Sequence, residues 1–498
     1  MIKRVRAAVL GVILACVGAG QALAASCGDV GRQVQRSGLG VDQAAVRAFY
    51  DAFGSGCAWD DSSAETLLSV LQAAGDHGLE PAVFHADAAG DGVERDILLT
   101  DGALKYAAAM TRGMTGAPPS KTDRAYSQAD SEFADGLIDA LAQGGISRWL
   151  DSLVPQSETY AHLVEALRTY RAYEAAGGFA ELPDSLAAKS KRKYRNYALL
   201  RQRLAMEGDL AADDGSTLFD EVLRAGLARF QERNGLRADG RMDWKTLEAL
   251  NVPPRQRAEQ IALNLERLRV SERETPETRV EVNIPAATAA LHRNGSIELR
   301  MNAVVGKVEH ETPTLTSTID TVILNPTWTV PQSIIKNEIM PAIRKNKNYL
   351  SNNRMYWAGE QLVQEPGAHN SLGRVKFDFP NRYSVYLHDT PAKRHFANPD
   401  RAQSHGCVRL EKPIELAEAL LQGSERWDRA AIEEAIEAGA TRRIALAEPI
   451  PVVITYQTVF LGEDGAVNFR ADVYGWDAKR ASTLAQKLAG LGAVGAQW

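Results

Sequence analysis

The chain has 498 residues, a net charge of −6, and ordinary shares of hydrophobic (45%) and charged (24%) residues. These proportions are typical of globular domains, and the length predicts about three of them. The modest negative charge argues against a protein that binds nucleic acid by bulk electrostatic attraction.

The first residues have the pattern of an export signal. Basic residues within the first six positions precede an apolar run over residues 7–20 and the small-residue site Ala22-Leu23-Ala24. The run is too short for a stable membrane span. We therefore expect a cleavable signal peptide over residues 1–24 and a periplasmic protein. An uncleaved N-terminal anchor is the alternative, and membrane contact is expected only in that case.

The cysteines fit an oxidising compartment. Cys16 lies in the predicted signal, so the mature chain keeps Cys27, Cys57 and Cys407. An odd count implies one leftover thiol. Cys27 and Cys57 are close in sequence and are candidates for a disulfide, which leaves Cys407 free.

Residues 25–206 are predicted to form a mostly helical scaffold domain. Tyr160, Leu163, Leu167 and Tyr170 recur at three- and four-residue spacing and mark one amphipathic helix, which Gly177-Gly178 ends. No catalytic pattern occurs in this region.

A small helical bundle is predicted over residues 207–254. Two apolar stripes at helical spacing flank two glycine turns. The stripes are Leu223, Leu227 and Phe230, then Trp244, Leu247 and Leu250. Such a bundle either binds a ligand or acts as a spacer. In the connecting segment 255–277, Ile261, Leu265 and Leu268 mark a helix that we expect to pack on the N-terminal scaffold.

From residue 278 to 498 the pattern is mainly that of antiparallel strands. Val280, Val282 and Ile284 alternate with polar residues, and Asn294-Gly295 is a strong hairpin signal. A helix is expected from Pro413 to Leu421. An insertion over residues 332–372 breaks the pattern with a helical, basic and aromatic stretch that contains Tyr356 and Trp357. On the residues alone, such a stretch is either a lid or a static structural elaboration.

The sequence Ser404-His405-Gly406-Cys407-Val408-Arg409-Leu410, with His388 upstream, combines a nucleophile with candidate bases. A cysteine attacks as thiolate and needs a nearby base or positive charge, which His388, His405 and Arg409 supply. Gly406 permits a tight turn that leaves its amide beside that of Cys407, as an oxyanion hole requires. Arg409 is also suited to bind a substrate carboxylate.

Two other interpretations of this motif remain open on the residues alone. Cys407 could be a buried apolar residue. His388, His405 and Cys407 could also supply three zinc ligands. The chain has no CxxC or HExxH motif, so we predict no metal and no cofactor.

These residues resemble the signature of the L,D-transpeptidases with a YkuD-type catalytic domain, which is a histidine followed by about fifteen residues and Ser/Thr-His-Gly-Cys-x-Asn/Arg. The segment Asn370-Ser371-Leu372-Gly373-Arg374-Val375-Lys376-Phe377 resembles the family's lead into the histidine strand. The resemblance implies a mixed β-sandwich in which Cys407 is the nucleophile, His388 the general base, Gly406 part of the oxyanion hole and His405 a supporting residue. Arg409 stands where many smaller members carry Asn.

Other segments resemble the large YcbB-like branch of this family. Asp76-His77-Gly78-Leu79-Glu80-Pro81 resembles its N-terminal scaffold, and Phe230-Gln231-Glu232-Arg233-Asn234-Gly235-Leu236 resembles a peptidoglycan-binding module. In that branch the insertion is a lid. The expected fold is therefore multidomain α+β, with a helical scaffold, a small helical peptidoglycan-binding bundle and a mainly antiparallel β-sandwich catalytic domain that carries a helical lid.

The resemblance implies an enzyme that forms 3→3 peptidoglycan cross-links through a Cys407 thioester and releases D-alanine from tetrapeptide stems. Tyr386, Ser404, Tyr356 and Trp357 are the expected substrate-binding residues. The expected partners are peptidoglycan stem peptides and glycan, with cell-wall synthases or carboxypeptidases beside them, and carbapenems are expected to acylate Cys407. The alternatives are an L,D-carboxypeptidase, a hydrolase that detaches lipoproteins, or a non-catalytic wall-binding scaffold.

Overall fold

The computed structural model describes residues 30–34, 38–54, 56–115, 126–187, 197–212, 215–424 and 426–490. The predicted signal peptide and Cys27 lie outside these residues. The chain divides into two compact units, one comprising Met1–Ala172, Ile261–Arg273 and Lys479–Trp498, the other Tyr173–Gln260 and Glu274–Ala478. Within the described ranges, no helix combines the length and the apolar character needed to cross a membrane.

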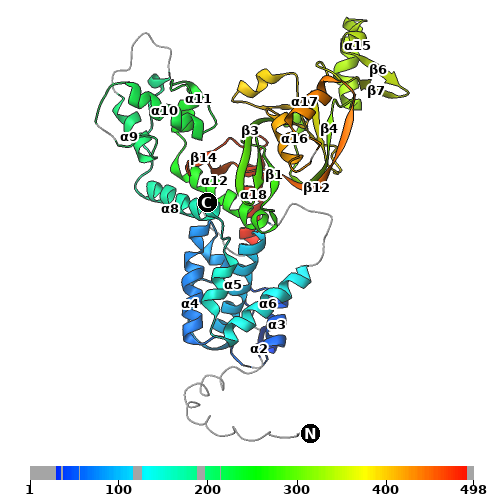
Figure 1. Ribbon diagram of the computed structural model, residues 1–498. Coiled ribbons are helices and arrows are strands. Elements are labelled where there is room, and N and C mark those ends of the chain that lie inside the picture. Colours follow the sequence, from blue (N-terminus) through cyan, green and yellow to red (C-terminus); the bar gives the residue numbers. More distant parts are fainter. Residues whose placement is uncertain are drawn as a thin grey trace, which may run out of the picture. The chain divides into compact units, whose positions relative to one another are not determined.

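The first unit is helical in its described part (Figure 1). Its helices are α2 (Val30–Val34), α3 (Gln43–Phe53), α4 (Asp61–Gln72), η1 (Ala73–His77), η2 (Pro81–Phe84), α5 (Gly92–Arg112), α6 (Tyr126–Ala142), α7 (Ile146–Leu153) and α8 (Glu158–Ala175). The predicted amphipathic helix is α8, whose stripe residues Tyr160, Leu163, Leu167 and Tyr170 are all buried. Gly177 and Gly178 follow it with φ of 103° and 80°. The prediction of a helical N-terminal region is confirmed.

Helix α12 (Pro254–Ser271) places its C-terminal half in this first unit, as expected. Arg269 is 1% exposed and donates to the His77 carbonyl at 2.7 Å and to Glu266 at 2.8 Å. Glu266 in turn accepts from the Thr115 N–H at 2.8 Å. A buried charge needs partners of this kind, so the network fastens α12 to the helical region.

The second unit begins with a small helical bundle that is larger than predicted. Besides α10 (Glu221–Arg233) and α11 (Trp244–Leu250) it includes η3 (Asp184–Leu186) and α9 (Ala198–Met206), which the sequence had assigned to the scaffold. Its core contains the predicted stripe residues Leu223, Leu227, Phe230, Leu247 and Leu250. Trp244 is the exception, because it starts α11 and is 50% exposed.

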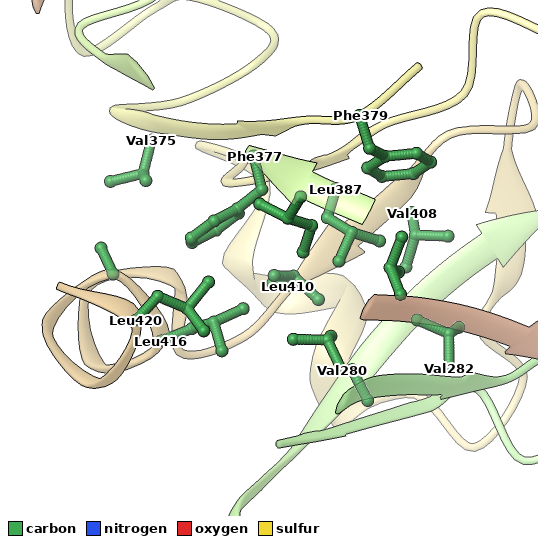
Figure 2. Close-up of a cluster of buried hydrophobic side chains, with 14 of the residues drawn as sticks. Val280, Val282, Val375, Phe377, Phe379, Leu387, Val408, Leu410, Leu416 and Leu420 are labelled. Atoms are coloured by element: carbon green, nitrogen blue, oxygen red, sulfur yellow. The ribbon is translucent and has the colours of Figure 1, made fainter. Parts of the chain in front are cut away.

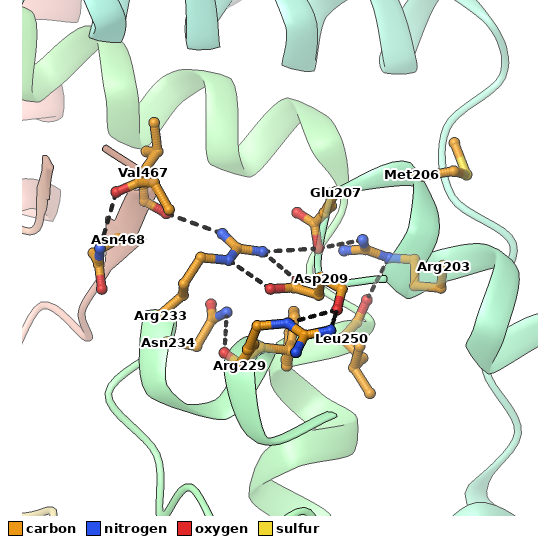
Figure 3. A network of polar contacts seen from close by, with 12 residues as sticks. Arg203, Met206, Glu207, Asp209, Arg229, Arg233, Asn234, Leu250, Val467 and Asn468 are labelled. Carbon is orange, nitrogen blue, oxygen red and sulfur yellow. Dashed lines mark hydrogen bonds and ion pairs between the residues drawn. The ribbon is translucent and has the colours of Figure 1, made fainter. Parts of the chain in front are cut away.

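A buried ion network fixes the bundle to the β-rich part of the same unit (Figure 3). The Arg233 guanidinium donates to both carboxylate oxygens of Asp209, at 2.9 and 2.6 Å, and to the carbonyl of Val467 at 2.9 Å. Glu207 lies between Arg203 and Arg233. Burial raises the pKa of Asp209, and the Arg233 charge opposes that shift.

Replacing Arg233 with methionine is expected to destabilise the protein by about 3–5 kcal/mol, because the Asp209 carboxylate then remains buried without its partner. Arg237→Met is the matched control, since Arg237 is 81% exposed and lies 3.8 Å from Asp239. Such an exposed pair contributes little. Chemical denaturation of the two variants and the wild type measures the difference. Equal stability of all three would contradict this account of the network.

The rest of the second unit is built on a sheet that spans nine strands in the described residues, in the order β10-β3-β11-β9-β8-β4-β12-β1-β2. Its strands are β1 (Arg279–Asn283), β2 (Thr288–Arg293), β3 (Ser296–Gly306), β4 (Leu315–Leu324), β8 (Val375–Asp378), β9 (Leu387–His388), β10 (Ala402–Ser404), β11 (Val408–Leu410) and β12 (Arg442–Thr455). An additional β2–β3 pairing closes the strands from β3 to β2 into a ring, and β10 pairs with β3 outside that ring. Most pairs are antiparallel, as predicted, but β1–β12, β9–β11 and β3–β10 are parallel.

The core of this sheet lies between its curved faces and two helices, α16 (Pro413–Leu420) and α17 (Arg429–Glu437). Figure 2 shows Val280, Phe377, Leu387 and Leu410 from the strands meeting Leu416 from α16. The predicted turn between β2 and β3 has φ of 51° at Asn294 and 79° at Gly295, the positive values that this sequence favours. The fold prediction is confirmed. The two layers of the predicted β-sandwich belong to one sheet that closes on itself.

The insertion is only partly helical, which corrects the prediction. Its helices are α13 (Gln332–Ile334), the π-helix η6 (Ile335–Ile339), α14 (Met340–Lys345) and α15 (Tyr349–Asn352). They are followed by a hairpin of β6 (Met355–Ala358) and β7 (Gln361–Gln364), which β5 (Trp328–Thr329) extends to three strands. Gly359, at φ 63°, makes the turn. Trp328 is 9% exposed and belongs to a separate apolar core under the insertion.

Shorter elements complete the second unit. They are η4 (Glu272–Glu274), η5 (Val308–His310), η7 (Lys393–Ala397) and the hairpin of β13 (Val459–Leu461) and β14 (Val467–Phe469), followed by α18 (Trp476–Gly490). η4 and α18 each have residues in both units.

Candidate active site

Cys407 lies in a turn between β10 and β11 that is held by side-chain hydrogen bonds. The Ser404 hydroxyl donates to the Cys407 carbonyl at 2.6 Å and accepts from the Gly406 N–H at 3.1 Å. The Thr312 hydroxyl donates to the Gly406 carbonyl at 2.8 Å. Gly406 has a φ of 105°, a conformation that other residues rarely adopt. The turn therefore fixes the backbone on both sides of the thiol.

These hydrogen bonds change the expected roles of Ser404 and Gly406. Ser404 is 1% exposed and both of its contacts shape the turn, so the structure does not present it to a substrate. The Gly406 N–H is already engaged by Ser404. The Cys407 N–H has no hydrogen-bond partner among the described residues. Of the two amides that we predicted for an oxyanion hole, only the Cys407 amide is open in this structure.

The Cys407 thiol is free and half-buried, with Sγ 3.8 Å from the Ser384 carbonyl oxygen. Burial raises the pKa of the thiol. Hydrogen bonding from Tyr386 and the positive charges of Lys376 and Arg409 oppose that rise. Cys57 is disulfide-bonded, and its expected partner, Cys27, lies outside the described residues.

His388 is placed beside the cysteine turn by strand pairing. The β9–β11 pairing sets His388 opposite Arg409 and Leu387 opposite Val408. The ring is 4% exposed, and Nδ1 donates to the carbonyl oxygen of Asp389. With Nδ1 donating, Nε2 is the ring nitrogen that can accept a proton, and a backbone hydrogen bond with Leu372 also acts on the ring. Burial, with the nearby Arg409 charge, lowers the pKa of His388 to about 4, so the imidazole is neutral at physiological pH.

Tyr386, Lys376 and Arg409 surround the thiol. The Lys376 ammonium lies 4.2 Å from the centre of the Tyr386 ring. The centres of the Tyr386 and His388 rings are 5.6 Å apart, and the two rings pack edge to face. Burial raises the pKa of Tyr386, and the adjacent Cys407 raises it further. Burial lowers the pKa of Arg409. The Arg409 side chain makes no hydrogen bond or ion pair with another residue of the described ranges, so its guanidinium is open to a ligand.

His405 makes a contact that the sequence did not indicate. Its Nε2 lies 2.6 Å from Oε1 of Glu338, which belongs to η6 of the insertion. Its ring also lies 4.9 Å from that of His310. The insertion thus touches the residue two positions before the cysteine. Tyr356 and Trp357 lie farther along the insertion on β6, 46% and 47% exposed, and their role in substrate binding stays a prediction.

The three residues named for the zinc interpretation take part in other contacts. Across the part of the chain that the structure describes, no group of three or more His, Cys, Asp or Glu side chains is arranged to hold a metal ion. His405 points Nε2 at Glu338, and His388 points Nδ1 at a carbonyl.

The thiol and the imidazole are both neutral at rest, and this gives a testable pH dependence. Because burial raises the pKa of Cys407 and holds that of His388 near 4, thiolate is scarce at neutral pH. Alkylation of Cys407 by iodoacetamide should therefore accelerate about tenfold per pH unit from roughly pH 6 to 9. A preformed thiolate–imidazolium pair would instead give a rate that is level over this range. Mass spectrometry of the alkylated peptide measures the rate.

Asp389 supports His388 and was missed in the sequence. Its carboxylate accepts from the Arg374 N–H at 2.8 Å and pairs with Lys393 at 2.7 Å. Gly373 packs directly against it, since a Cβ there would lie 2.4 Å from the Asp389 carboxyl carbon. The close approach requires glycine and holds Asp389, whose carbonyl orients the imidazole.

Gly373→Ala is therefore expected to destabilise the protein and slow acylation of Cys407. Gly359→Ala is a matched control, because both glycines have a φ of 63° but a Cβ at Gly359 meets nothing within 4 Å. The positive φ alone costs about 1–2 kcal/mol, and the clash should add about 1–3 kcal/mol at Gly373. Denaturation curves and the acylation rate compare the two. Equal losses of stability and of acylation rate in the two variants would show that the Asp389 side chain moves aside without cost, which would contradict this account.

Three family models match the chain. Residues 44–167 match a scaffold domain, residues 195–250 a "Putative peptidoglycan binding domain", and residues 277–435 the L,D-transpeptidase catalytic domain of the YkuD family. The third match contains the whole cysteine turn and His388.

Among curated proteins, the chain is similar to one from Haemophilus influenzae named "Putative L,D-transpeptidase", with 28% identity over 241 residues, 44% of this chain and 48% of that protein. The chain thus spans about half the length of this relative.

Two solved structures are also similar. An L,D-transpeptidase from Mycobacterium smegmatis has 16% identity and a TM-score of 0.20, over 36% of this chain and 58% of that one. The catalytic domain of an E. faecium L,D-transpeptidase acylated by ertapenem has 14% identity and a TM-score of 0.21, over 36% of this chain and 98% of that one. These likenesses are too weak to add to the family match. On the matched models, the chain carries a YkuD-type L,D-transpeptidase catalytic domain over residues 277–435, together with a scaffold domain and a peptidoglycan-binding domain.

Proposed function

We propose that this protein is an L,D-transpeptidase that forms 3→3 cross-links between peptidoglycan stem peptides. The observation that supports this most is the free Cys407 thiol in a turn whose following strand, β11, pairs with the strand of buried His388 and carries Arg409, whose charge acts on the thiol. A wall-binding scaffold needs none of these three groups in one place. The peptidoglycan-binding and transpeptidase domains support peptidoglycan as the substrate class.

In the first half of the reaction, the acyl group moves to sulfur. Nε2 of neutral His388 takes the thiol proton, and Sγ attacks the carbonyl carbon that joins the third stem residue to the terminal D-alanine. The Cys407 N–H, which has no partner in the described structure, donates to the oxyanion of the tetrahedral intermediate. The C–N bond breaks, the proton from His388 passes to the departing nitrogen, and D-alanine leaves a thioester on Cys407.

Arg409 suits the recognition of the terminal carboxylate in this step. A guanidinium binds a carboxylate through two parallel N–H bonds, and this interaction is strong where water is excluded. Arg409 is half-buried and pairs with no side chain in the described structure. The terminal carboxylate of a substrate that ends in D-alanine would supply an anionic partner for the Arg409 guanidinium.

In the second half, an amine from a neighbouring stem attacks the thioester carbon. The nitrogen forms the new amide, the C–S bond breaks, and the thiol is restored with one proton from the amine. The side-chain amine of diaminopimelate is the proposed acceptor. The insertion reaches the cysteine turn through the Glu338–His405 contact, and its proposed role as a lid favours the amine over water, because shielding a thioester from solvent slows hydrolysis.

A hydrolase on the same domain is the second candidate, either an L,D-carboxypeptidase or an enzyme that detaches lipoproteins. The half-exposed Glu338–His405 contact is the observation that favours it, since water could enter beside this contact.

We also propose a periplasmic location, based on the signal-like N-terminus, with cell-wall synthases or carboxypeptidases supplying or sharing the substrate.

Incubation of the protein from residue 25 onward with a disaccharide-tetrapeptide, followed by mass spectrometry of the products, tests the proposal. A dimer lighter than two monomers by the mass lost when one D-alanine is released supports transpeptidation. Tripeptide as the sole product would favour the hydrolase. Retained glycan binding without turnover would favour the scaffold.

A further inference from the structure

Glu338 is the charged residue of the insertion that reaches the catalytic turn through a direct contact. Its Oε1 lies 2.6 Å from His405 Nε2, while 52% of its side chain remains exposed. It is carried by η6, a π-helix, and such helices often occur at functional sites. The His405 contact fixes the carboxylate and leaves its second oxygen available to a ligand.

Glu338 and Arg409 form a pair of opposite charges on the two sides of the cysteine turn. Arg409 lies two positions after Cys407 on β11, and His405, which holds Glu338, lies two positions before it. The two charges interact electrostatically, since the negative charge of Glu338 raises the pKa of Arg409 while burial lowers it. The two side chains form no ion pair with each other in the described structure, where Glu338 pairs with His405. A carboxylate and a guanidinium complement the two charges of a zwitterion.

In the proposed reaction a zwitterionic amino acid end lies beside the Cys407 thioester in two steps, the release of D-alanine and the entry of the acceptor. Acylation releases D-alanine, which carries an ammonium and a carboxylate on one carbon. The acceptor end of diaminopimelate carries the same two groups on one carbon. Attack of an amine on the thioester is the reverse of the departure of D-alanine, so the departing and incoming amino acids pass through the same site.

Building on the proposed transpeptidation, we infer that Glu338 and Arg409 together form the acceptor site, in which Glu338 binds the ammonium and Arg409 the adjacent carboxylate of the incoming amino acid. The acceptor is thereby selected as an amino acid end and not as a simple amine. His405 is a positioning residue that holds the Glu338 carboxylate. Before attack the ammonium releases one proton to solvent beside Glu338, and the resulting amine forms the C–N bond.

The test compares wild type with Glu338→Gln and the control Glu360→Gln, which removes the same charge from the exposed hairpin of the insertion. Cys407 is first acylated with the tetrapeptide, and the thioester is then offered glycine, glycinamide or hydroxylamine. The ratio of amide product to hydrolysed tripeptide is measured for each nucleophile. Acylation of Cys407 by a carbapenem, which expels no amino acid, reports separately on the first half-reaction.

We expect wild type and Glu360→Gln to prefer glycine over glycinamide. Glu338→Gln should lower the glycine ratio about tenfold, the effect of losing one hydrogen bond to a charged group. Its reaction with hydroxylamine, which is uncharged at neutral pH, and its carbapenem acylation should stay as in wild type.

Two outcomes would overturn the inference while leaving the proposed function intact. An unchanged glycine ratio in Glu338→Gln with normal acylation would remove Glu338 from the acceptor site. An equal fall for glycine and hydroxylamine would show that Glu338 acts only by keeping the insertion closed against water. Failure of wild type to be acylated by either the tetrapeptide or a carbapenem would instead reject the proposed function, and the acceptor site with it.

Discussion

Cys407→Ala is expected to lower the turnover of tetrapeptide by at least about a thousandfold, because the thiolate is the only group proposed to form a bond with the substrate. The fold should survive the change. The thiol makes a long contact, 3.8 Å, with the Ser384 carbonyl and hydrogen bonds with Tyr386, but the turn itself is held by Ser404 and Thr312. Release of D-alanine measures turnover, and thermal unfolding confirms that the variant is folded.

Cys57 gives a useful contrast for this experiment. It is disulfide-bonded and therefore has no nucleophilic thiol. A Cys57→Ala variant that keeps wild-type turnover once folded would show that loss of a cysteine as such is not the cause. Substantial turnover by folded Cys407→Ala would refute the assignment of the nucleophile.

His388→Gln is expected to reduce acylation of Cys407 by about 10²–10⁴-fold, the usual contribution of a general base. Glutamine keeps a donor toward the Asp389 carbonyl but offers no basic nitrogen to the thiol. The wild-type acylation rate should fall only below about pH 4–5, where His388, whose pKa lies near 4, becomes protonated. This acidic limb should vanish in the variant.

His405→Gln separates the two histidines of the motif. Its Nε2 faces Glu338 and not the thiol, so this variant should retain most of the carbapenem acylation rate. A collapse of acylation in His405→Gln, with little effect in His388→Gln, would exchange the roles that we assign. Both rates are measured by intact-protein mass spectrometry over the same pH series.

The elements of this fold are predictable where the sequence pattern is local. The α8 stripe, the α10 and α11 stripes and the Asn294-Gly295 turn each follow from spacing or from residues with a strong conformational preference. The insertion was less predictable. The insertion contains many helix-forming and basic residues, so its sequence did not predict the short β6–β7 hairpin. A single glycine, Gly359, was the sequence signal for that turn.

The cysteine turn was predictable in composition but not in its hydrogen bonding. Cys407, His388 and Arg409 were singled out by residue type and spacing, and β9–β11 pairing brings His388 opposite Arg409. Whether the Gly406 amide is free depends on the rotamer of Ser404, which no sequence pattern specifies. Glu338 lies 67 residues before His405 in the sequence. Such a contact arises only when the insertion folds back on the sheet.

The pKa values were also beyond the sequence. The same His388 side chain on an exposed loop would keep its ordinary pKa, whereas burial lowers that pKa to about 4 here. Burial depends on neighbours from β8, β9 and β11 together. The sequence could name the base but not its protonation state.

The central claim is that Cys407 forms a thioester with the stem peptide. The most direct test is to quench the reaction of the protein with tetrapeptide in acid, digest it, and determine the mass of the peptide that contains Cys407. We predict an added mass equal to the substrate minus D-alanine, located on Cys407 and removed by hydroxylamine. Turnover without such an adduct, or an adduct on another residue, would contradict the account.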